Sequence, residues 1–207
     1  MTLRIEADWL ADPALQRLLA ALGGEGEEAR VVGGAVRNQL MGRRIADVDL
    51  ATTCLPAETA RRAEEAGFRA IPTGIAHGTV TAVGPDGHAY EVTTLREDVA
   101  TDGRHAAVRF GRDWRVDAER RDFTINALYC DADGTVLDLV GGIADIESGT
   151  LRFIGDAQRR IEEDYLRILR FFRFFAWYGS GRPDGEGLRA CARLKDGLAR
   201  LSVERVW

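Results

Sequence analysis

Apolar residues at the start of the chain recur with the spacing of one helix face. Leucines between Leu15 and Leu22 follow this spacing and a glycine pair comes directly after them, so a helix is expected over Pro13–Leu22. The next patterns predict alternating short strands and helices, with Gly–Gly, Gly and Pro at their borders. Strands are expected at 29–32 and 48–51, and helices at 35–41 and 56–66.

The middle of the chain changes to alternation of apolar and polar residues. Thr79 to Val83 alternates with a period of two and is followed by a Gly-Pro-Asp-Gly turn signal, so residues 79–95 are expected to form a β-hairpin. A second hairpin is expected over residues 129–139. Residues 123–128 look helical, whereas residues 97–119 lack a clear period and are expected to form a mobile loop.

Strand patterns almost vanish beyond Gly142. Helices are expected at 156–178 and 186–195, and Ser202 has the character of an N-cap that opens a further helix. The fold class is therefore expected to be α+β. We expect a mixed head over residues 1–140 and an all-α segment over residues 141–207.

The composition is that of a folded globular chain. Its 207 residues are 45% hydrophobic and 29% charged, which excludes disordered and collagen-like proteins. No run reaches the roughly 18–20 apolar residues of a membrane span, and the N-terminus does not resemble a secretory signal. No membrane partner and a cytoplasmic location are therefore expected. The three cysteines are far apart and suggest buried thiols rather than disulfides or zinc ligands.

Charge is distributed unevenly along the chain. Residues 1–151 carry 16 basic and 25 acidic groups, a net −9, whereas residues 152–207 carry 12 and 8, a net +4. All the cations but Lys195 are arginines, whose planar guanidinium suits phosphates and base edges, although genomic composition would produce the same bias. The basic end is thus the part better suited to a nucleic acid, while the oligomeric state stays open.

The first candidate chemistry lies in the segment from Gly33 to Asp49. Asp47 and Asp49 are two residues apart on an expected strand, where their carboxylates share a face and suit a hard cation such as Mg²⁺. Gly33 and Gly34 precede an expected helix, where backbone N–H groups can approach phosphates, and Arg37 follows. Each half alone also fits a plain turn or a solvated strand. Their joint spacing favours a site for metal and triphosphate.

Further candidates come from three other segments. Glu91, on an expected strand, is the best third acid for a two-metal site, although a solvated strand face would look the same. Arg120-Arg121-Asp122 precedes a short apolar segment, which would let the arginines reach an anion or simply cap a surface helix. Asp164, Arg167, Arg170 and Arg173 form a polar helix stripe, which is equally typical of an exposed face with salt bridges.

Four motifs together carry a resemblance to a known family. They are Gly-Gly-Ala-Val-Arg at 33–37, Asp-Val-Asp at 47–49, Arg-Arg-Asp-Phe-Thr-Ile-Asn-Ala-Leu at 120–128 and Glu-Asp-Tyr-Leu-Arg at 163–167. In this order and spacing they closely resemble the class II tRNA nucleotidyltransferases, the CCA-adding enzymes, and their bacterial poly(A) polymerase relatives. The resemblance covers about residues 28–207. It implies a polymerase-β-like nucleotidyltransferase head followed by a helical neck, which this chain would leave incomplete at its C-terminal end.

The resemblance also implies roles for individual residues. Asp47 and Asp49 would hold catalytic Mg²⁺, and Glu91, chosen above from its place on a neighbouring strand, is expected to be the third catalytic acid. Asn38 departs from the aspartate that the family usually has after the arginine. Residues that would bind the nucleotide, its phosphates, sugar or base are Gly33, Gly34, Arg37, Arg121, Asp122, Asn126, Asp164, Arg167, Arg170 and Arg173.

The implied reaction is addition of C and A to the 3′ end of tRNA from CTP and ATP. Asp164 and Arg167 would read the base without a template, because cytosine and adenine both present an amine donor beside a ring-nitrogen acceptor. A poly(A) polymerase or a CC- or A-adding paralogue would share these motifs. Two alternatives from other classes are a module that binds nucleotide or RNA without turnover and a purely structural domain.

Overall fold

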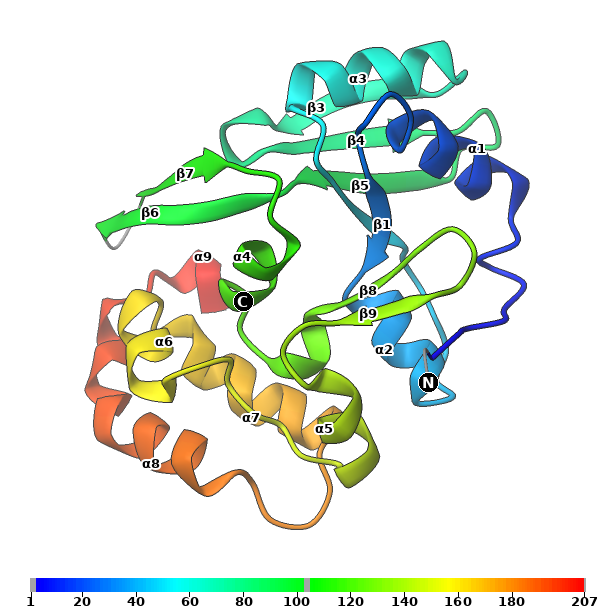
Figure 1. Ribbon diagram of the computed structural model, residues 1–207. Helices are drawn as coiled ribbons and strands as arrows, with labels where there is room; N and C mark the ends of the chain where they lie inside the picture. The colour runs from blue at the N-terminus through cyan, green and yellow to red at the C-terminus, as the bar shows by residue number, and fades with distance from the viewer. Residues whose placement is uncertain (1–2, 103–104, 207) are drawn as a thin grey trace.

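The computed structural model describes residues 3–102 and 105–206. Its centre is a seven-stranded mixed sheet in the order β3-β4-β5-β2-β1-β8-β9, in which β2 and β5 are parallel and the other neighbours are antiparallel. The β6–β7 hairpin forms a separate sheet (Figure 1). The strands are β1 (Ala29–Val32), β2 (Asp49–Thr52), β3 (Arg69–Gly74), β4 (Thr79–Val83), β5 (Ala89–Thr94), β6 (Arg96–Asp102), β7 (His105–Phe110), β8 (Leu128–Cys130) and β9 (Val136–Asp138).

The helices begin at the caps that the sequence provides. Asp12 accepts a hydrogen bond from the N–H of Leu15 at 2.9 Å, and Pro13 fits the first helical position of α1. The α-helices are α1 (Pro13–Leu22), α2 (Gly34–Leu40), α3 (Pro56–Glu65), α4 (Trp114–Glu119), α5 (Gly142–Ser148), α6 (Ala157–Glu163), α7 (Leu166–Tyr178), α8 (Gly185–Leu194) and α9 (Val203–Val206). Short 3₁₀ turns are η1 (Ile75–His77), η2 (Thr124–Asn126) and η3 (Lys195–Arg200).

The two faces of the sheet have different neighbours. Side chains such as Val31, Leu50 and Val92 are buried in a core with α1 and α3. Successive strand residues point to opposite faces, so Val32 and Tyr129 belong to a second core, on the side of α4. Figure 1 shows α1 and α3 at one end of the molecule and α5 to α8 gathered at the other. The second face of the sheet is therefore the one turned toward the helical part.

The helical part has its own aromatic core. Phe171 of α7 is fully buried and stacks on Phe153, with ring centroids 5.4 Å apart. Phe123 and Ile125 pack into the same core, although they precede β8 of the head. The expected division at residues 140 and 141 stays a prediction, and the packing shows that segment 123–125 contributes to the helical core.

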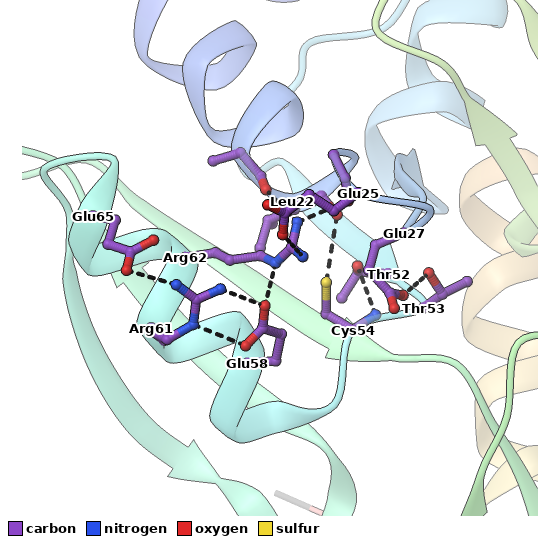
Figure 2. A network of polar contacts seen from close by, with 12 residues as sticks. Leu22, Glu25, Glu27, Thr52, Thr53, Cys54, Glu58, Arg61, Arg62 and Glu65 are labelled. Carbon is purple, nitrogen blue, oxygen red and sulfur yellow. Dashed lines mark hydrogen bonds and ion pairs between the residues drawn. The ribbon is translucent and has the colours of Figure 1, made fainter.

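A polar network joins the two helices that cover the first face of the sheet. Figure 2 shows Arg62 of α3 reaching the loop after α1, where its guanidinium donates to the carbonyl of Gly24 at 2.8 Å and pairs with Glu25 at 2.9 Å. Cys54, a buried thiol as expected, lies beside Leu22 at the same junction. This network ties α1 to α3 on the face away from the helical part.

The structure confirms the α+β fold class and most of the expected elements, and corrects three. Residues 97–102 and 105–119 form most of strands β6 and β7 and helix α4 rather than a loop, and the rest of the expected loop, 103–104, lies outside the described residues. Their pattern misleads because charged residues such as Glu97 and Arg109 pair across the strands, in place of an apolar face. The expected helix at 123–128 is only η2, because Leu128 already joins the sheet. The expected helix at 156–178 is interrupted at Asp164, whose backbone is extended.

One edge strand, β3, was not expected from the sequence. It contains Pro72, and its register with β4 shifts between Ile71 and Gly74. Proline and an irregular register are typical of sheet edges, where one side of the strand needs no partner. The strand therefore carries neither the alternation nor the turn signals by which the other strands were recognised.

Candidate active site

Two acids lie side by side on the face of the sheet that is turned toward the helical part. β2 and β5 are parallel, with Leu50 opposite Val92. Asp49 precedes Leu50 and Glu91 precedes Val92, so these two acids are neighbours on adjacent strands. Both side chains point away from the face that buries Leu50 and Val92. Val32 of β1 lies opposite Asp49 and continues the row. The strand register thus brings together two of the three acids that the sequence singled out.

The third acid, Asp47, completes an electrostatic cluster. The pKa of Asp49 is raised above its ordinary value, first because surrounding protein desolvates the carboxylate and then because Glu91 and Asp47 repel its charge. Arg121 acts on Asp49 in the opposite direction. All three acids are exposed, and no side-chain hydrogen bond or ion pair joins them to another residue in the described part of the chain. The cluster therefore carries a net negative charge, only partly balanced by Arg121, that is open to a ligand.

This donor set fits a hard divalent cation. Carboxylate oxygens are the ligands that Mg²⁺ prefers, and a cation would relieve the repulsion that raises the pKa of Asp49. Among the described residues, no group of three or more acidic, histidine or cysteine side chains converges closely enough to hold an ion by itself. Mg²⁺ commonly uses only one or two carboxylates together with water and substrate phosphates. Asp47 and Asp49 are thus the residues that could hold it.

The glycine corner leads the chain from β1 into α2. Gly33 has a φ of 71°, which glycine adopts without strain, and its N–H donates to the carbonyl of Leu128 at 2.9 Å. Gly34 begins the helix directly after it. The corner therefore starts one strand away from the acids, since Val32 lies opposite Asp49.

Arg37, expected at the triphosphate, is largely buried in contacts between head and helical part. Its guanidinium donates to Asn126, to Asn38 at 3.0 Å and to the hydroxyl of Tyr178 at 2.8 Å, and it stacks on the Tyr178 ring at 4.0 Å. Burial lowers the pKa of Arg37. Its hydrogen-bond partners are neutral, and Asp122 acts on it only through its charge. Asn38, the departure from the family pattern, thus leaves this cation without a directly bound carboxylate.

Asp122 joins the motif segment to α7. One carboxylate oxygen accepts from Arg170, with an ion-pair distance of 2.6 Å, and the other accepts from Asn126 at 3.1 Å. Asn126 in turn accepts from Arg37. Four residues from the nucleotide-binding prediction, Arg37, Asn126, Asp122 and Arg170, therefore form one continuous polar network across the junction of head and helical part.

Arg121 is held by Asp117 and Tyr129, which are not among the site residues predicted from the sequence. Asp117 of α4 pairs with Arg121 at 2.9 Å, and the hydroxyl of Tyr129 donates to the same carboxylate at 2.8 Å. Asp117 also pairs with Arg120. The spacing of Asp117 to these arginines, three and four residues along a helix, was the signal available in the sequence.

Asp164 and Arg167 are separately engaged in the helical part. Asp164 pairs with Arg205 near the end of the chain at 2.9 Å, and Arg167 pairs with Glu163 at 2.7 Å. Arg167 also approaches the carbonyl of Arg120 at 3.4 Å, which places α7 beside the motif segment. Arg173 is exposed. In the described residues no side-chain contact links Asp164 or Arg167 to the acid cluster, and their role as base readers stays a prediction.

A large groove lies beside this region but does not include the predicted site residues. It has a volume of about 1000 Å³ and is lined by α4, α6 and the segment between α5 and α6. Its charged side chains have both signs, among them Arg115, Arg120, Glu119 and Glu163. The mixed charge does not favour a phosphate chain over other ligands, so the acid cluster remains the stronger candidate.

The sequence of this chain matches a known protein family and several of its members. Residues 29–152 match the family described as the poly A polymerase head domain. The chain belongs to this family. It is 47% identical over 196 residues to CCA tRNA nucleotidyltransferase 1, mitochondrial, of Mus musculus, covering 93% of this chain and 45% of the mouse protein. The chain thus spans about half the length of the curated relatives it matches.

Solved structures of family members have the same fold over nearly the whole chain. The Bacillus stearothermophilus CCA-adding enzyme in complex with CTP is 37% identical, with a TM-score of 0.81, over 94% of this chain and 47% of that one. The Thermotoga maritima CCA-adding enzyme complexed with tRNA is 26% identical, with a TM-score of 0.76, over 98% and 46%. The similarity extends past the matched head segment into the helical part, over 94–98% of this chain.

Two findings bear on the membrane and on the location. In the residues that the structure describes, no helix is long and apolar enough to cross a membrane. The cytoplasmic location stays a prediction, since the mouse relative is named as mitochondrial.

Proposed function

We propose that this chain is the head and the first part of the neck of a CCA-adding tRNA nucleotidyltransferase. It would transfer C and A from CTP and ATP to the 3′ end of tRNA with release of pyrophosphate. The observation that carries the proposal is the exposed cluster of Asp47, Asp49 and Glu91 beside Arg121. The names of the relatives, and the CTP and tRNA in the solved complexes, support the same reaction.

The chain's own residues contribute positioning and charge, which supply most of the catalysis in nucleotidyl transfer. Mg²⁺, when bound, would activate the attacking 3′-hydroxyl and neutralise charge on the leaving pyrophosphate. Asp47 and Asp49 would hold it, and Glu91 adds negative charge on the neighbouring strand. Arg121 supplies the positive charge next to these acids that a triphosphate needs.

Base selection would fall to Asp164 and Arg167. An ionised aspartate accepts from the exocyclic amine of cytosine or adenine, and an arginine donates to the adjacent ring nitrogen. Uracil and guanine present the opposite pattern, and each mismatch costs about 1–3 kcal/mol as an unpaired polar group. To serve in this way Asp164 has to exchange its pairing with Arg205, and Arg167 its pairing with Glu163, for the base.

Nucleotide addition to tRNA without its 3′ CCA tests the proposal. The 207-residue chain is incubated with Mg²⁺ and each nucleotide separately and together, and the products are sequenced. Addition of C, C and A in order, lost in Asp49→Asn, is the expected result. Arg69→Gln, a charge change on the exposed edge strand β3, is a matched control that should leave addition unchanged.

The family description keeps a poly(A) polymerase as the second candidate function. That enzyme would add a run of A from ATP alone and would not require CTP. A product of this kind, or addition confined to CC or to a terminal A, would replace the CCA assignment. Nucleotide binding without any addition would show a binding module instead.

A further inference from the structure

A buried carboxylate lies behind the arginine that faces the acid cluster. Asp117 of α4 has a side chain only 1% exposed. One of its oxygens accepts from Arg120, with an ion-pair distance of 2.6 Å. The other accepts from Arg121 through Nη2 at 2.9 Å and Nε at 3.1 Å, and from the hydroxyl of Tyr129 at 2.8 Å. Both oxygens of Asp117 are therefore fully engaged.

Tyr129, which donates to Asp117, lies in the same cross-strand row of the sheet as Asp49. Val32 lies opposite Asp49 on one side and opposite Tyr129 on the other. Directly opposed residues of antiparallel strands share a face, so Asp49, Val32 and Tyr129 form one row across three strands. Tyr129 is fully buried and packs edge-on against Trp114, which begins α4. The sheet thus fixes the distance between Asp49 and the tyrosine that orients Asp117.

Arg121 interacts with two sets of negative charge, the buried carboxylate of Asp117 and the acid cluster. Burial alone would raise the pKa of Asp117, but the charges of Arg121 and Arg120 and the hydrogen bond from Tyr129 bring it to about 2. One carboxylate faces two guanidinium groups, so one positive charge remains uncompensated. The charge of Arg121 also acts on Asp49, where it opposes the rise in pKa that burial and the neighbouring acids cause. Its guanidinium therefore lies between a fixed internal anion and the acid cluster.

We propose that Asp117 and Tyr129 are positioning residues that hold Arg121 in place for the phosphates of the incoming nucleoside triphosphate. This inference rests on the proposed function. A guanidinium that donates two of its N–H groups to a fixed carboxylate keeps its remaining donors pointing in a defined direction. Without the carboxylate, rotation of the arginine side chain would spread these donors over many orientations. The positioning is needed most when charge develops on the phosphates, so its loss lowers kcat more than it raises KM for the nucleotide.

Kinetics of three variants test the positioning role. Asp117→Asn removes the charge and keeps the shape, and it should lower kcat for C addition at least tenfold with less than a threefold rise in KM. Tyr129→Phe removes one hydrogen bond and should lower kcat about threefold. Glu119→Gln, a matched charge loss on the exposed side of the same helix, should retain full activity, because Glu119 pairs at most with Arg115, at 3.9 Å.

A double variant separates positioning from a general loss of structure. If Asp117 acts through Arg121, adding Asp117→Asn to Arg121→Lys should cost little beyond Arg121→Lys alone. Full additivity of the two losses would overturn the proposal. So would an Asp117→Asn chain that melts earlier yet keeps the wild-type kcat at a temperature where it is folded. Tyr129→Phe keeps the test valid where Asp117→Asn does not fold.

An NMR measurement tests the clamp, meaning the contacts of Asp117 and Tyr129 that hold Arg121, independently of the proposed function. The Nε–H of Arg121 should exchange slowly with solvent in the wild-type chain and in Glu119→Gln, and at least tenfold faster in Tyr129→Phe and Asp117→Asn. Unchanged exchange in both of these variants would refute the clamp whether or not the chain adds nucleotides. A wild-type chain that adds no nucleotide but shows the expected exchange would instead refute the proposed function alone.

Discussion

The ion pair between Asp122 and Arg170 offers a direct measure of how firmly α7 is attached to the segment that precedes β8. The Asp122 side chain is 10% exposed and that of Arg170 is 32% exposed, so the pair is partly shielded from water. It includes a hydrogen bond of 2.7 Å from the Nε of Arg170. Hydrogen bonds to charged groups contribute about 1.5–3 kcal/mol, and exposed pairs at most about 1 kcal/mol. We therefore expect Asp122→Asn to lower the free energy of unfolding by about 2 kcal/mol.

Urea unfolding at 25 °C, followed by tryptophan fluorescence and circular dichroism, measures this loss. With a dependence of about 2–3 kcal/mol per molar urea, the midpoint should fall by about 0.7–1 M. Arg170→Gln should have a similar effect, and the double variant should lose about 1 kcal/mol less than the sum of the two single losses. Arg173→Gln on the exposed side of α7 should stay within about 0.5 kcal/mol of wild type.

Two results would refute this reasoning. Equal midpoints for Asp122→Asn and Arg173→Gln would show that the pair contributes no more than an exposed charge. Strict additivity of Asp122→Asn and Arg170→Gln would show that the two side chains do not stabilise each other. In either case the polar network from Arg37 to Arg170 would describe proximity and not attachment.

Three further outcomes are expected. The folded pKa of Asp49 lies above its ordinary value of 3.8, so its contribution to stability is present at low pH and lost as the pH rises through the folded pKa. Asp49→Asn should therefore raise the melting temperature at pH 7 by about 1–2 °C. A decrease would contradict the repulsion between Asp49 and the neighbouring acids. Phe123→Ala removes a fully buried ring between Phe153 and Phe174 and should cost about 3–5 kcal/mol in urea unfolding, whereas a cost below 1 kcal/mol would mean that this core is loosely packed. Gly142→Ala places a methyl group against the carbonyl of Thr124 and should cost about 1–3 kcal/mol in the same assay, with an unchanged midpoint as the contrary result.

The sequence alone predicts those elements whose apolar face meets a core. Helix α1 and the β4–β5 hairpin have the expected bounds or nearly so, because their leucines and valines alternate with the period of the element. The β6–β7 hairpin escapes this reasoning because its strands form a separate sheet outside the main one. The break at Asp164 escapes it for another reason. Its carboxylate accepts from the N–H of Leu166, a local competition that the apolar pattern does not record.

For the site, the sequence predicts which acids share a face but not which residues hold the arginines. Asp49 and Glu91 are adjacent through the strand register, which period-two patterns can suggest. Asp117 lies four residues before Arg121, a helical spacing that the sequence does show, whereas Tyr129 of β8 is brought to them by the tertiary fold. Arg37 shows the reverse case. Its motif points to a phosphate contact, whereas the structure engages it with Tyr178, which is 141 residues away in sequence.

The placement of Phe123 and Ile125 determines how this protein can be divided. Arg121 and Asp122 form ion pairs beside the candidate site, and the next residues are anchored in the core of the helical part. A chain produced without α6 to α8 would expose a phenylalanine that is now fully covered, and the loop that carries Arg121 and Asp122 would lose its anchor. The unit that evolution or an engineer can exchange between relatives is therefore not the head alone. Segment 120–126 has to be exchanged together with the helices against which Phe123 and Ile125 pack.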